Sequence, residues 1–220
     1  MNVSNNNTCP IAKISATEYN KEVYEPSDDT FALVDAFVQD SETWNAREPH
    51  ICVEIGSGSG YVLTSSGLAL QSKHRSCLLL GVDVTVAAAA ATKRTLAAHG
   101  VEADIVRCDL LGAFSPRLHK QIDLILFNPP YVVTSNEEVS VDGISAAWAG
   151  GQDGRVVIDR LLSALDTFLS PSGLLYMIAI QDNKPKQLIE ELRSKHGLQA
   201  SILLSRRADE ELIHVLRVHR

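Results

Sequence analysis

The sequence lacks several features that would assign it to a common class of protein. Its 220 residues include 4 cysteines (Cys9, Cys52, Cys77 and Cys108) and no C-x-x-C pair, so neither a zinc pattern nor a disulfide framework is expected. It also lacks an uninterrupted run of about 18 apolar residues, so no transmembrane helix is expected. Residues 1–8 are polar and lack the apolar core of a signal peptide. We therefore expect a reducing, intracellular setting.

An excess of basic residues is also missing. The chain has 27 acidic and 20 basic residues, and residues 1–60, with 10 acidic and 3 basic residues, carry the whole net charge of −7. Such a distribution lacks the basic footprint of a nucleic-acid-binding protein. The hydrophobic content of 45% argues against a disordered chain.

Strand-like and helix-like segments alternate along the chain. A helical pattern starts at Ser27, and further helices are predicted over residues 86–99, 156–169 and 185–196. Apolar strands are predicted over residues 51–55, 77–82, 103–108, 122–127 and 174–180, with an antiparallel pair at residues 202–204 and 212–218. This alternation predicts an α/β fold with a parallel sheet covered on both faces. Residues 1–23 are predicted to be a flexible lead-in, and residues 24–220 a single domain.

A glycine-rich string follows the first predicted strand, at the sheet edge where open α/β folds bind ligands. Residues 54–60 read E-I-G-S-G-S-G, which allows unusual backbone angles and close approach of a ligand. The dinucleotide fingerprint needs glycine at position 61, which is Tyr61, and no G-K-[ST] sequence is present. The turn is therefore predicted to hold something other than a pyrophosphate.

Carboxylates stand at three successive strand ends. Asp83 can accept hydrogen bonds from two ribose hydroxyls, Asp109 can meet the exocyclic amine of a base, and Glu54 adds a third carboxylate. A lone acid at such a place is often only a helix cap. Three of them, together with the glycine string, favour a pocket for a cationic ligand such as a sulfonium.

The most specific motif is Asn128-Pro129-Pro130-Tyr131, after the fourth predicted strand. Two prolines fix the backbone and remove two N–H donors. The Asn128 Oδ1 atom and the Pro129 carbonyl can then accept the hydrogens of a planar –NH2 group while Tyr131 stacks on it. The competing interpretation is an ordinary proline-rich loop with an Asn cap.

In this order, these motifs resemble the class I S-adenosylmethionine-dependent methyltransferases with the N-P-P-Y signature. Y-E-P-S-D-D-T-F at residues 24–31, N-P-P-Y-V-V-T at 128–134 and A-A-W-A-G-G at 146–151 are similar to the HemK-related eukaryotic and archaeal branch. The resemblance covers nearly the whole chain from Tyr24 onward. It implies a Rossmann-like seven-stranded sheet of order 3-2-1-4-5-7-6 and N5-methylation of the glutamine in the Gly-Gly-Gln motif of class I translation termination (release) factor.

The resemblance also implies the roles of individual residues. The residues implied to bind the cofactor, S-adenosyl-L-methionine, are Thr30, Glu54, Gly56, Gly58, Asp83, Asp109, Leu110 and Asn128. Those implied to bind the substrate are Asn128, Pro129, Pro130, Tyr131 and Trp148, of which Asn128, Pro129 and Tyr131 are implied to be catalytic. Trp148 is implied to close over the substrate, although the sequence alone equally allows a core anchor. No residue is implied to bind a metal.

The expected reaction is an in-line displacement at the sulfonium methyl group by an amide nitrogen, which needs positioning rather than a general base. We therefore expect His99, His119, His196 and His214 to be surface or core residues. N6-methylation of adenine in nucleic acid presents the same –NH2 geometry and stays an alternative, as do other protein residues such as a histone lysine. A non-catalytic scaffold is a further alternative.

The resemblance implies one more partner besides the release factor, a small zinc-binding activator subunit. It is expected to add a strand to the edge strand at residues 103–108, because an uncovered edge favours aggregation. Cytoplasmic localisation, with the nucleus as a second compartment, is implied as well. Finally, Glu25, Asp28, Asp29 and Glu54 are expected to form an acidic entrance to the cofactor pocket.

Overall fold

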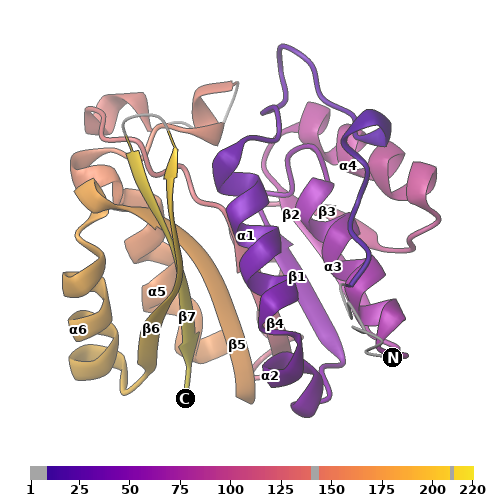
Figure 1. Cartoon of the computed structure of the whole chain (residues 1–220). Helices are drawn as coiled ribbons and strands as arrows, with labels where there is room; N and C mark the ends of the chain where they lie inside the picture. The colour runs from indigo at the N-terminus through magenta and orange to yellow at the C-terminus, as the bar shows by residue number, and fades with distance from the viewer. Residues whose placement is uncertain (1–8, 140–143, 209–210) are drawn as a thin grey trace, which may run out of the picture.

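The computed structural model describes residues 9–139, 144–208 and 211–220 (Figure 1). The α-helices are α1 (Asp28–Gln39), α2 (Ser41–Ala46), α3 (Tyr61–Ser72), α4 (Val86–His99), α5 (Val156–Phe168) and α6 (Pro185–His196). The strands are β1 (Ile51–Ile55), β2 (Leu78–Asp83), β3 (Asp104–Arg107), β4 (Ile122–Phe127), β5 (Leu169–Ile180), β6 (Gln199–Ala208) and β7 (Glu211–His219).

The strands form one seven-stranded sheet of order β3-β2-β1-β4-β5-β7-β6. The first five strands pair in parallel, and β7 pairs antiparallel with both β5 and β6. The strand order reverses between β1 and β4, which start the two halves of the sheet. The order that the resemblance implies is therefore confirmed, and the reversal places a ligand site at the carboxyl ends of β1 and β4.

Helices cover both faces of the sheet, because successive strand residues point to opposite sides. In β4, Leu124 and Leu126 join an apolar cluster with the helices α1 to α4, whereas Ile125 and Phe127 join a second cluster with α5 and α6. Figure 1 shows α1 lying across the front of the sheet and α5 behind it. Both faces of the central strands β1, β2 and β4 are buried, so these strands read as nearly continuous apolar runs.

Three elements differ from the sequence-based expectation. The helices α2 and α3 were not predicted: α2 has only 6 residues, and α3 is buried on nearly all sides, so neither shows an amphipathic pattern. Pro171 and Gly173 were expected to lie before the fifth strand, but β5 includes both. The ladder between β4 and β5 shifts register there, and such a bulge tolerates a proline.

The segment 9–23 packs on the domain instead of forming a separate mobile lead-in. Cys9, Ala12 and Val23 are buried. Three backbone N–H groups donate to side chains of α3 and α4: Ala12 to Ser65 Oγ (3.1 Å), Lys13 to His99 Nε2 (2.8 Å) and Glu18 to Thr95 Oγ1 (2.9 Å). Residues 1–8 lie outside the described residues, and the boundary at residue 24 stays a prediction.

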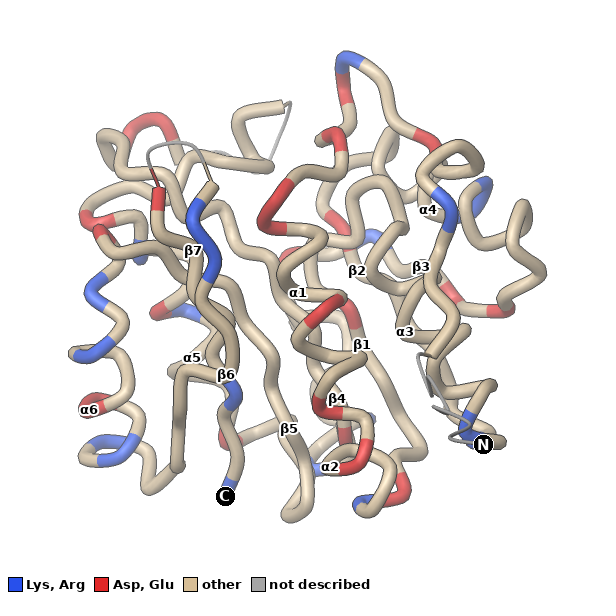
Figure 2. The backbone as a smooth tube through the Cα atoms, viewed as in Figure 1, with Lys and Arg blue, Asp and Glu red and all other residues tan. Residues whose placement is uncertain are grey.

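Charged residues are unevenly placed on this framework. Figure 2 shows acidic segments at the N-terminal end of α1, and basic segments along α6 and on one half of β6. Within the described ranges, no helix is both long and apolar enough to cross a membrane. In the same ranges, no group of three or more His, Cys, Asp or Glu side chains is placed to hold a metal ion.

Candidate active site

A cavity of about 290 Å³ opens where the carboxyl ends of β1, β2 and β4 meet. It lies at the reversal of strand order, as expected for an open α/β sheet. Most of the residues predicted from the sequence line this one cavity: Thr30, Glu54, Gly56, Gly58, Asp83, Asp109, Leu110, Asn128 and Pro130. The separate motifs of the sequence therefore build a single site.

The glycine string forms the turn from β1 into α3. Gly56, Gly58 and Gly60 have φ angles of 70°, 50° and 79°, in the left-handed region that favours glycine. A Cβ atom on Gly60 would lie 2.8 Å from the Cα atom of Thr92 in α4. Gly56 and Gly58 face the cavity with no such close neighbour, so the turn leaves open backbone for a ligand to approach.

Asp83 ends β2 and joins this turn to the next one. Its Oδ2 atom accepts a hydrogen bond from the Gly58 N–H (3.0 Å), and its Oδ1 atom accepts from the Thr85 N–H (2.9 Å) and hydroxyl (3.1 Å). These contacts hold the carboxylate in one orientation beside the cavity. The Oδ1 atom thus already accepts two hydrogen bonds, whereas Oδ2 accepts one and can take another from a ligand hydroxyl.

Glu54 lies deeper, with only 3% of its surface exposed. Its Oε2 atom accepts a hydrogen bond from the Leu63 N–H at the start of α3 (2.8 Å). Burial raises the pKa of Glu54 well above its ordinary value of 4.5, the Leu63 N–H partly opposes this rise, and the nearby Asp83 charge adds to it. Glu54 is thus a carboxyl group whose ionised form would be stabilised by a cationic ligand.

Asp109 is not a free carboxylate as expected, because it forms an ion pair with Arg160 of α5. Both residues line the cavity. Their charges offset each other, so among the described residues the carboxyl groups of the cavity lining without an ion-pair partner are those of Glu22, Glu54 and Asp83. No local pattern points to Arg160, which lies 51 residues after Asp109 in the amphipathic helix α5.

A buried carboxylate that sequence reasoning misplaced organises the N-P-P-Y end of the cavity. Asp29 is only 3% exposed, and its Oδ2 atom accepts hydrogen bonds from Asn128 Nδ2 (3.1 Å), the Tyr131 hydroxyl (3.0 Å) and the Tyr24 hydroxyl (3.1 Å). A carboxylate only accepts hydrogen bonds, so the Asn128 amide must present its –NH2 group to it. The Asn128 Oδ1 atom is buried and has no hydrogen-bond partner among the described residues.

The two tyrosines of this cluster act as neutral donors. Burial and the Asp29 charge raise the pKa of both Tyr24 and Tyr131 above the ordinary value of 10.0. Tyr131 and the buried Pro129 do not line the cavity. Stacking of Tyr131 on a substrate amide therefore stays a prediction, while the hydroxyl of Tyr131 is held by Asp29.

The N-P-P-Y loop docks against the A-A-W-A-G-G segment. The Val132 N–H donates to the Trp148 carbonyl (3.0 Å), and the Gly150 N–H returns a bond to the Val132 carbonyl (2.8 Å). A Cβ atom on Gly154 would lie 1.9 Å from the Tyr131 carbonyl oxygen. The side chain of Trp148 is 36% exposed and does not line the cavity, so it is not a core anchor.

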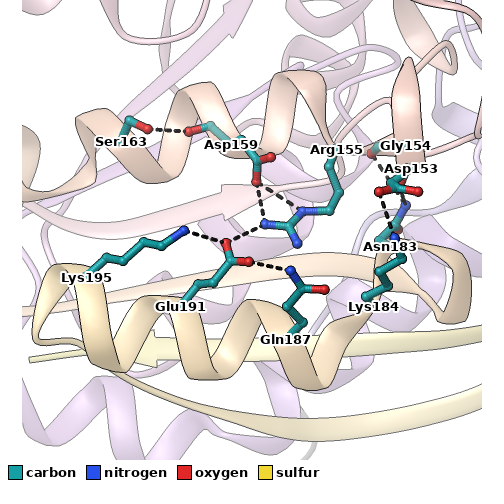
Figure 3. Close-up of polar contacts among 10 residues, drawn as sticks. All are labelled: Asp153, Gly154, Arg155, Asp159, Ser163, Asn183, Lys184, Gln187, Glu191 and Lys195. Atoms are coloured by element: carbon teal, nitrogen blue, oxygen red, sulfur yellow. Dashed lines mark hydrogen bonds and ion pairs between the residues drawn. The ribbon is translucent and has the colours of Figure 1, made fainter.

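The fully buried side-chain amide of Asn183 ties these loops to the rest of the sheet. The Asn183 Nδ2 atom donates to the Tyr131 carbonyl (2.9 Å), and its Oδ1 atom accepts from the Ile180 N–H at the end of β5 (2.8 Å). Nδ2 also donates to the Asp153 carbonyl (3.0 Å; Figure 3). Asn183 thus links the loop after β4 to the end of β5. Its position in a short polar turn gave no sequence signal for this role.

The neighbouring Arg155 holds α5 against α6 (Figure 3). Its guanidinium donates to Asp159 Oδ1 and Glu191 Oε2, both at 2.8 Å. Hydrogen bonding from Arg155 lowers the pKa of Glu191 to about 2, so this pair stays charged at neutral pH. These hydrogen bonds of Arg155 therefore hold the end of the loop that precedes α5 in place beside the site.

Two further expectations concern charge and histidine. Glu25 and Asp28 are exposed, but Asp29 and Glu54 are buried, so an acidic entrance built from all four is wrong. None of His99, His119, His196 and His214 lines the cavity. This placement agrees with a reaction that uses no histidine.

Comparison with known proteins agrees with this geometry. The family model for the methyltransferase small domain matches residues 33–147. Methyltransferase HEMK2 of Homo sapiens is 40% identical over 89% of each chain. The eRF1 methyltransferase catalytic subunit mtq2 of Schizosaccharomyces pombe is 34% identical over 91% of this chain and 90% of its own.

A solved structure of the same kind has the same fold. It is the Mtq2–Trm112 complex of E. cuniculi, described as responsible for methylation of the eRF1 translation termination factor. The matched chain is 28% identical, with a TM-score of 0.63 over 90% of this chain and 98% of that one. With its cavity at the reversal of strand order and N-P-P-Y at the end of β4, the chain belongs to the methyltransferase small-domain family, and it is a methyltransferase.

Proposed function

We propose that this methyltransferase uses S-adenosylmethionine to methylate the side-chain nitrogen, N5, of the glutamine in the Gly-Gly-Gln motif of class I release factor. The observation that carries the proposal is the Asn128 amide, whose buried Oδ1 atom is an acceptor without a partner among the described residues. A buried acceptor left unpaired is costly, so it suits a substrate that brings an N–H donor. The relatives named for eRF1 methylation support the same substrate.

The residues around the cavity fit the proposed cofactor. Glu54 and Asp83 offer carboxylates to a cation and to ribose hydroxyls, and Gly56 and Gly58 leave open backbone beside them. We assign Thr30, Glu54 and Gly56 to its methionine part, Asp83 to the ribose, and Asp109 with Leu110 to the adenine. Gly58 lets the turn into α3 come close to the cofactor. When bound, S-adenosylmethionine supplies a methyl group activated by its sulfonium charge.

The chemistry asked of the chain is mainly positioning. An amide nitrogen is a weak nucleophile because its lone pair is delocalised into the carbonyl. Acceptance of the amide hydrogens by Asn128 Oδ1 and the Pro129 carbonyl would orient the nitrogen and stabilise the positive charge that develops on it. The C–N bond forms as the C–S bond breaks, and the proton then leaves the nitrogen to water, so no dedicated base is required.

A small activator subunit is part of the proposal. The E. cuniculi relative is a complex with Trm112, and β3 of this chain is an edge strand that a partner can extend. The zinc that the resemblance implies would belong to that partner. We place the enzyme in the cytoplasm, with the nucleus as a second compartment.

The test is a methylation assay with labelled S-adenosylmethionine and purified release factor, run with and without the activator subunit. We expect methyl transfer to wild-type release factor, none to a variant with Ala in place of the motif glutamine, and a mass-spectrometric assignment to the glutamine side chain. The variant Asn128→Ala should bind S-adenosylhomocysteine as the wild type does while turnover falls at least about 100-fold.

Competing substrates are included as separate arms of the assay. Methyl incorporation into an oligonucleotide or a histone lysine, without incorporation into the release factor, would replace the proposal with one of those alternatives. Turnover of Asn128→Ala at the wild-type rate would remove the role assigned to Asn128.

A further inference from the structure

We propose that Asp29 is a positioning residue that sets the orientation of the Asn128 amide, so that Oδ1 rather than Nδ2 meets the substrate. The inference rests on the proposed glutamine methylation, and it assigns a role to a residue that does not line the cavity. From the sequence, Asp29 was expected to be one of several charges at the entrance to the cofactor pocket. Its surroundings in the structure instead link it to both polar side chains of the N-P-P-Y loop.

Five hydrogen bonds meet on this one carboxylate. The Oδ1 atom accepts from the Thr30 N–H (2.6 Å) and hydroxyl (3.1 Å), which fixes the carboxylate in the first turn of α1. The Oδ2 atom accepts from Tyr24, Asn128 and Tyr131 at 3.0–3.1 Å. The carboxylate is 3% exposed, so these donors replace water almost completely.

The orientation of the Asn128 amide follows from the charge of its neighbour. Rotated by half a turn, the amide would place its own oxygen about 3 Å from a carboxylate oxygen, with no hydrogen between them. The –NH2 group would then face the substrate amide, donor against donor. Asp29 excludes this arrangement, because in a buried site the repulsion between two acceptors is weakly screened.

The tyrosine hydroxyls add to this selection. Burial and the Asp29 charge raise the pKa of Tyr131 and Tyr24, so both hydroxyls stay protonated and point their hydrogens at Oδ2. Tyr131 belongs to the same loop as Asn128, whereas Tyr24 lies just before α1. The Asp29 carboxylate, on α1, therefore fixes both polar side chains of the N-P-P-Y loop.

The experiment compares Asp29→Asn with wild type in the methylation assay, using release factor with its activator. An Asn side chain at position 29 keeps an oxygen for Thr30 and turns its –NH2 group toward Asn128, which then rotates its amide. We expect kcat to fall at least about tenfold, with the dissociation constant of S-adenosylhomocysteine changed less than about threefold. The matched control is Asp28→Asn, the same charge change on the exposed neighbour in α1, which should leave kcat unchanged.

A double-mutant cycle separates positioning from a general loss of structure. If Asp29 acts through Asn128, then Asp29→Asn should cost nothing further in an Asn128→Ala background. The pair Asp29→Asn with Asn128→Asp should recover part of the lost kcat, because a carboxylate at position 128 presents an acceptor to both sides. Recovery of this kind is not expected from a residue that only stabilises the fold.

Each remaining outcome overturns the inference. An unchanged kcat in Asp29→Asn, an additive effect in the Asn128→Ala background, or loss of cofactor binding with early unfolding would each reject positioning by Asp29. Failure of the wild-type enzyme to methylate the release factor would instead reject the proposed function. The two failures are therefore distinguishable.

Discussion

Glu54 is a carboxyl group with almost no water around it and one backbone donor, the Leu63 N–H. Its burial raises its pKa above 4.5, which is the ordinary value expected in the unfolded chain. In the absence of a ligand, the folded protein therefore keeps a proton that the unfolded chain has already released. The fold carries this cost for a group that a cation would stabilise.

The sign of the resulting pH dependence follows directly. Above pH 4.5 the unfolded state binds fewer protons at this position, so Glu54 lowers the free energy of unfolding as the pH rises toward its raised pKa. In Glu54→Gln this contribution disappears, so the variant should become progressively more stable than wild type over that range. The difference can grow by up to about 1.4 kcal/mol per pH unit.

Urea unfolding without cofactor, measured between about pH 5 and pH 8, gives this difference. The control is Glu190→Gln, the same chemical change at an exposed position of α6. If the stability of Glu54→Gln runs parallel to wild type at every pH, the buried carboxyl group is not titrating as described.

Some residues of the site can be predicted from a local sequence pattern, whereas others depend on contacts with distant parts of the chain. Glu54, Asp83 and Asn128 could be found because each ends a strand, and strand ends converge at one edge of a parallel sheet. Asp29 looked like an ordinary charge at a helix start, and only its burial against residues 99 and 102 positions away reveals its contacts. The Arg160 partner of Asp109 likewise depends on tertiary packing that no local pattern encodes.

The element most exposed to disruption is the loop after β4, which touches the A-A-W-A-G-G segment through backbone atoms. Gly154 has a φ angle of 63°, and no side chain fits between it and the Tyr131 carbonyl. From the end of β5, Asn183 donates a hydrogen bond to the same Tyr131 carbonyl. Close backbone contact at Gly154 and the hydrogen bond from Asn183 thus help to hold the loop in place.

Gly154→Ala should therefore displace the N-P-P-Y loop. We expect the free energy of unfolding to fall by at least about 2 kcal/mol and kcat to fall at least about tenfold. Gly197→Ala is the matched control: Gly197 has nearly the same φ angle, 64°, but open space around its added Cβ. Gly197→Ala should lower the free energy of unfolding by only about 1 kcal/mol, because only the left-handed backbone conformation is unfavourable for Ala there. It should leave kcat unchanged.

Thermal or urea unfolding and steady-state kinetics measure the pair. Equal effects of the two substitutions on kcat would show that contact with the Tyr131 carbonyl does not hold the loop.

Elements with local start and stop signals were predicted well. The predicted bounds of α4 and α6 match the structure, because Thr85 caps α4 with its side chain and Gly197 ends α6 in the left-handed conformation. The helix α3 was missed because contacts on nearly every side hide its period. The strand β6 runs well beyond the predicted residues 202–204, since its outer positions are polar and its pairing with β7 sets its length.

At the scale of the whole molecule, the sheet has two edges of different length. The strand β3 has 4 residues and lies beside the cofactor half of the sheet, whereas β6 has 10 residues at the antiparallel end. Either edge offers unpaired backbone groups to another chain. The proposed activator is assigned to β3.

Hydrogen exchange on the free chain and on the complex tests that assignment. The backbone amides of residues 104–107 should exchange at least about tenfold more slowly in the complex, while those of β6 keep their rates and provide the internal control. We also expect the free chain to be poorly soluble. Protection confined to β6, or high solubility of the free chain as a monomer, would contradict the assignment.

The docked segment 9–23 bears on the order in which the protein assembles during synthesis. Its partners Ser65, Thr95 and His99 follow it in the sequence by 53, 77 and 86 residues. During synthesis this segment leaves the ribosomal exit tunnel long before α4 does, so it cannot form its contacts with α4 until α4 has emerged. Glu22, Val23 and Tyr24, which line the cavity, are therefore the first part of the pocket to be translated, yet the segment that carries them can dock only after α4 has emerged.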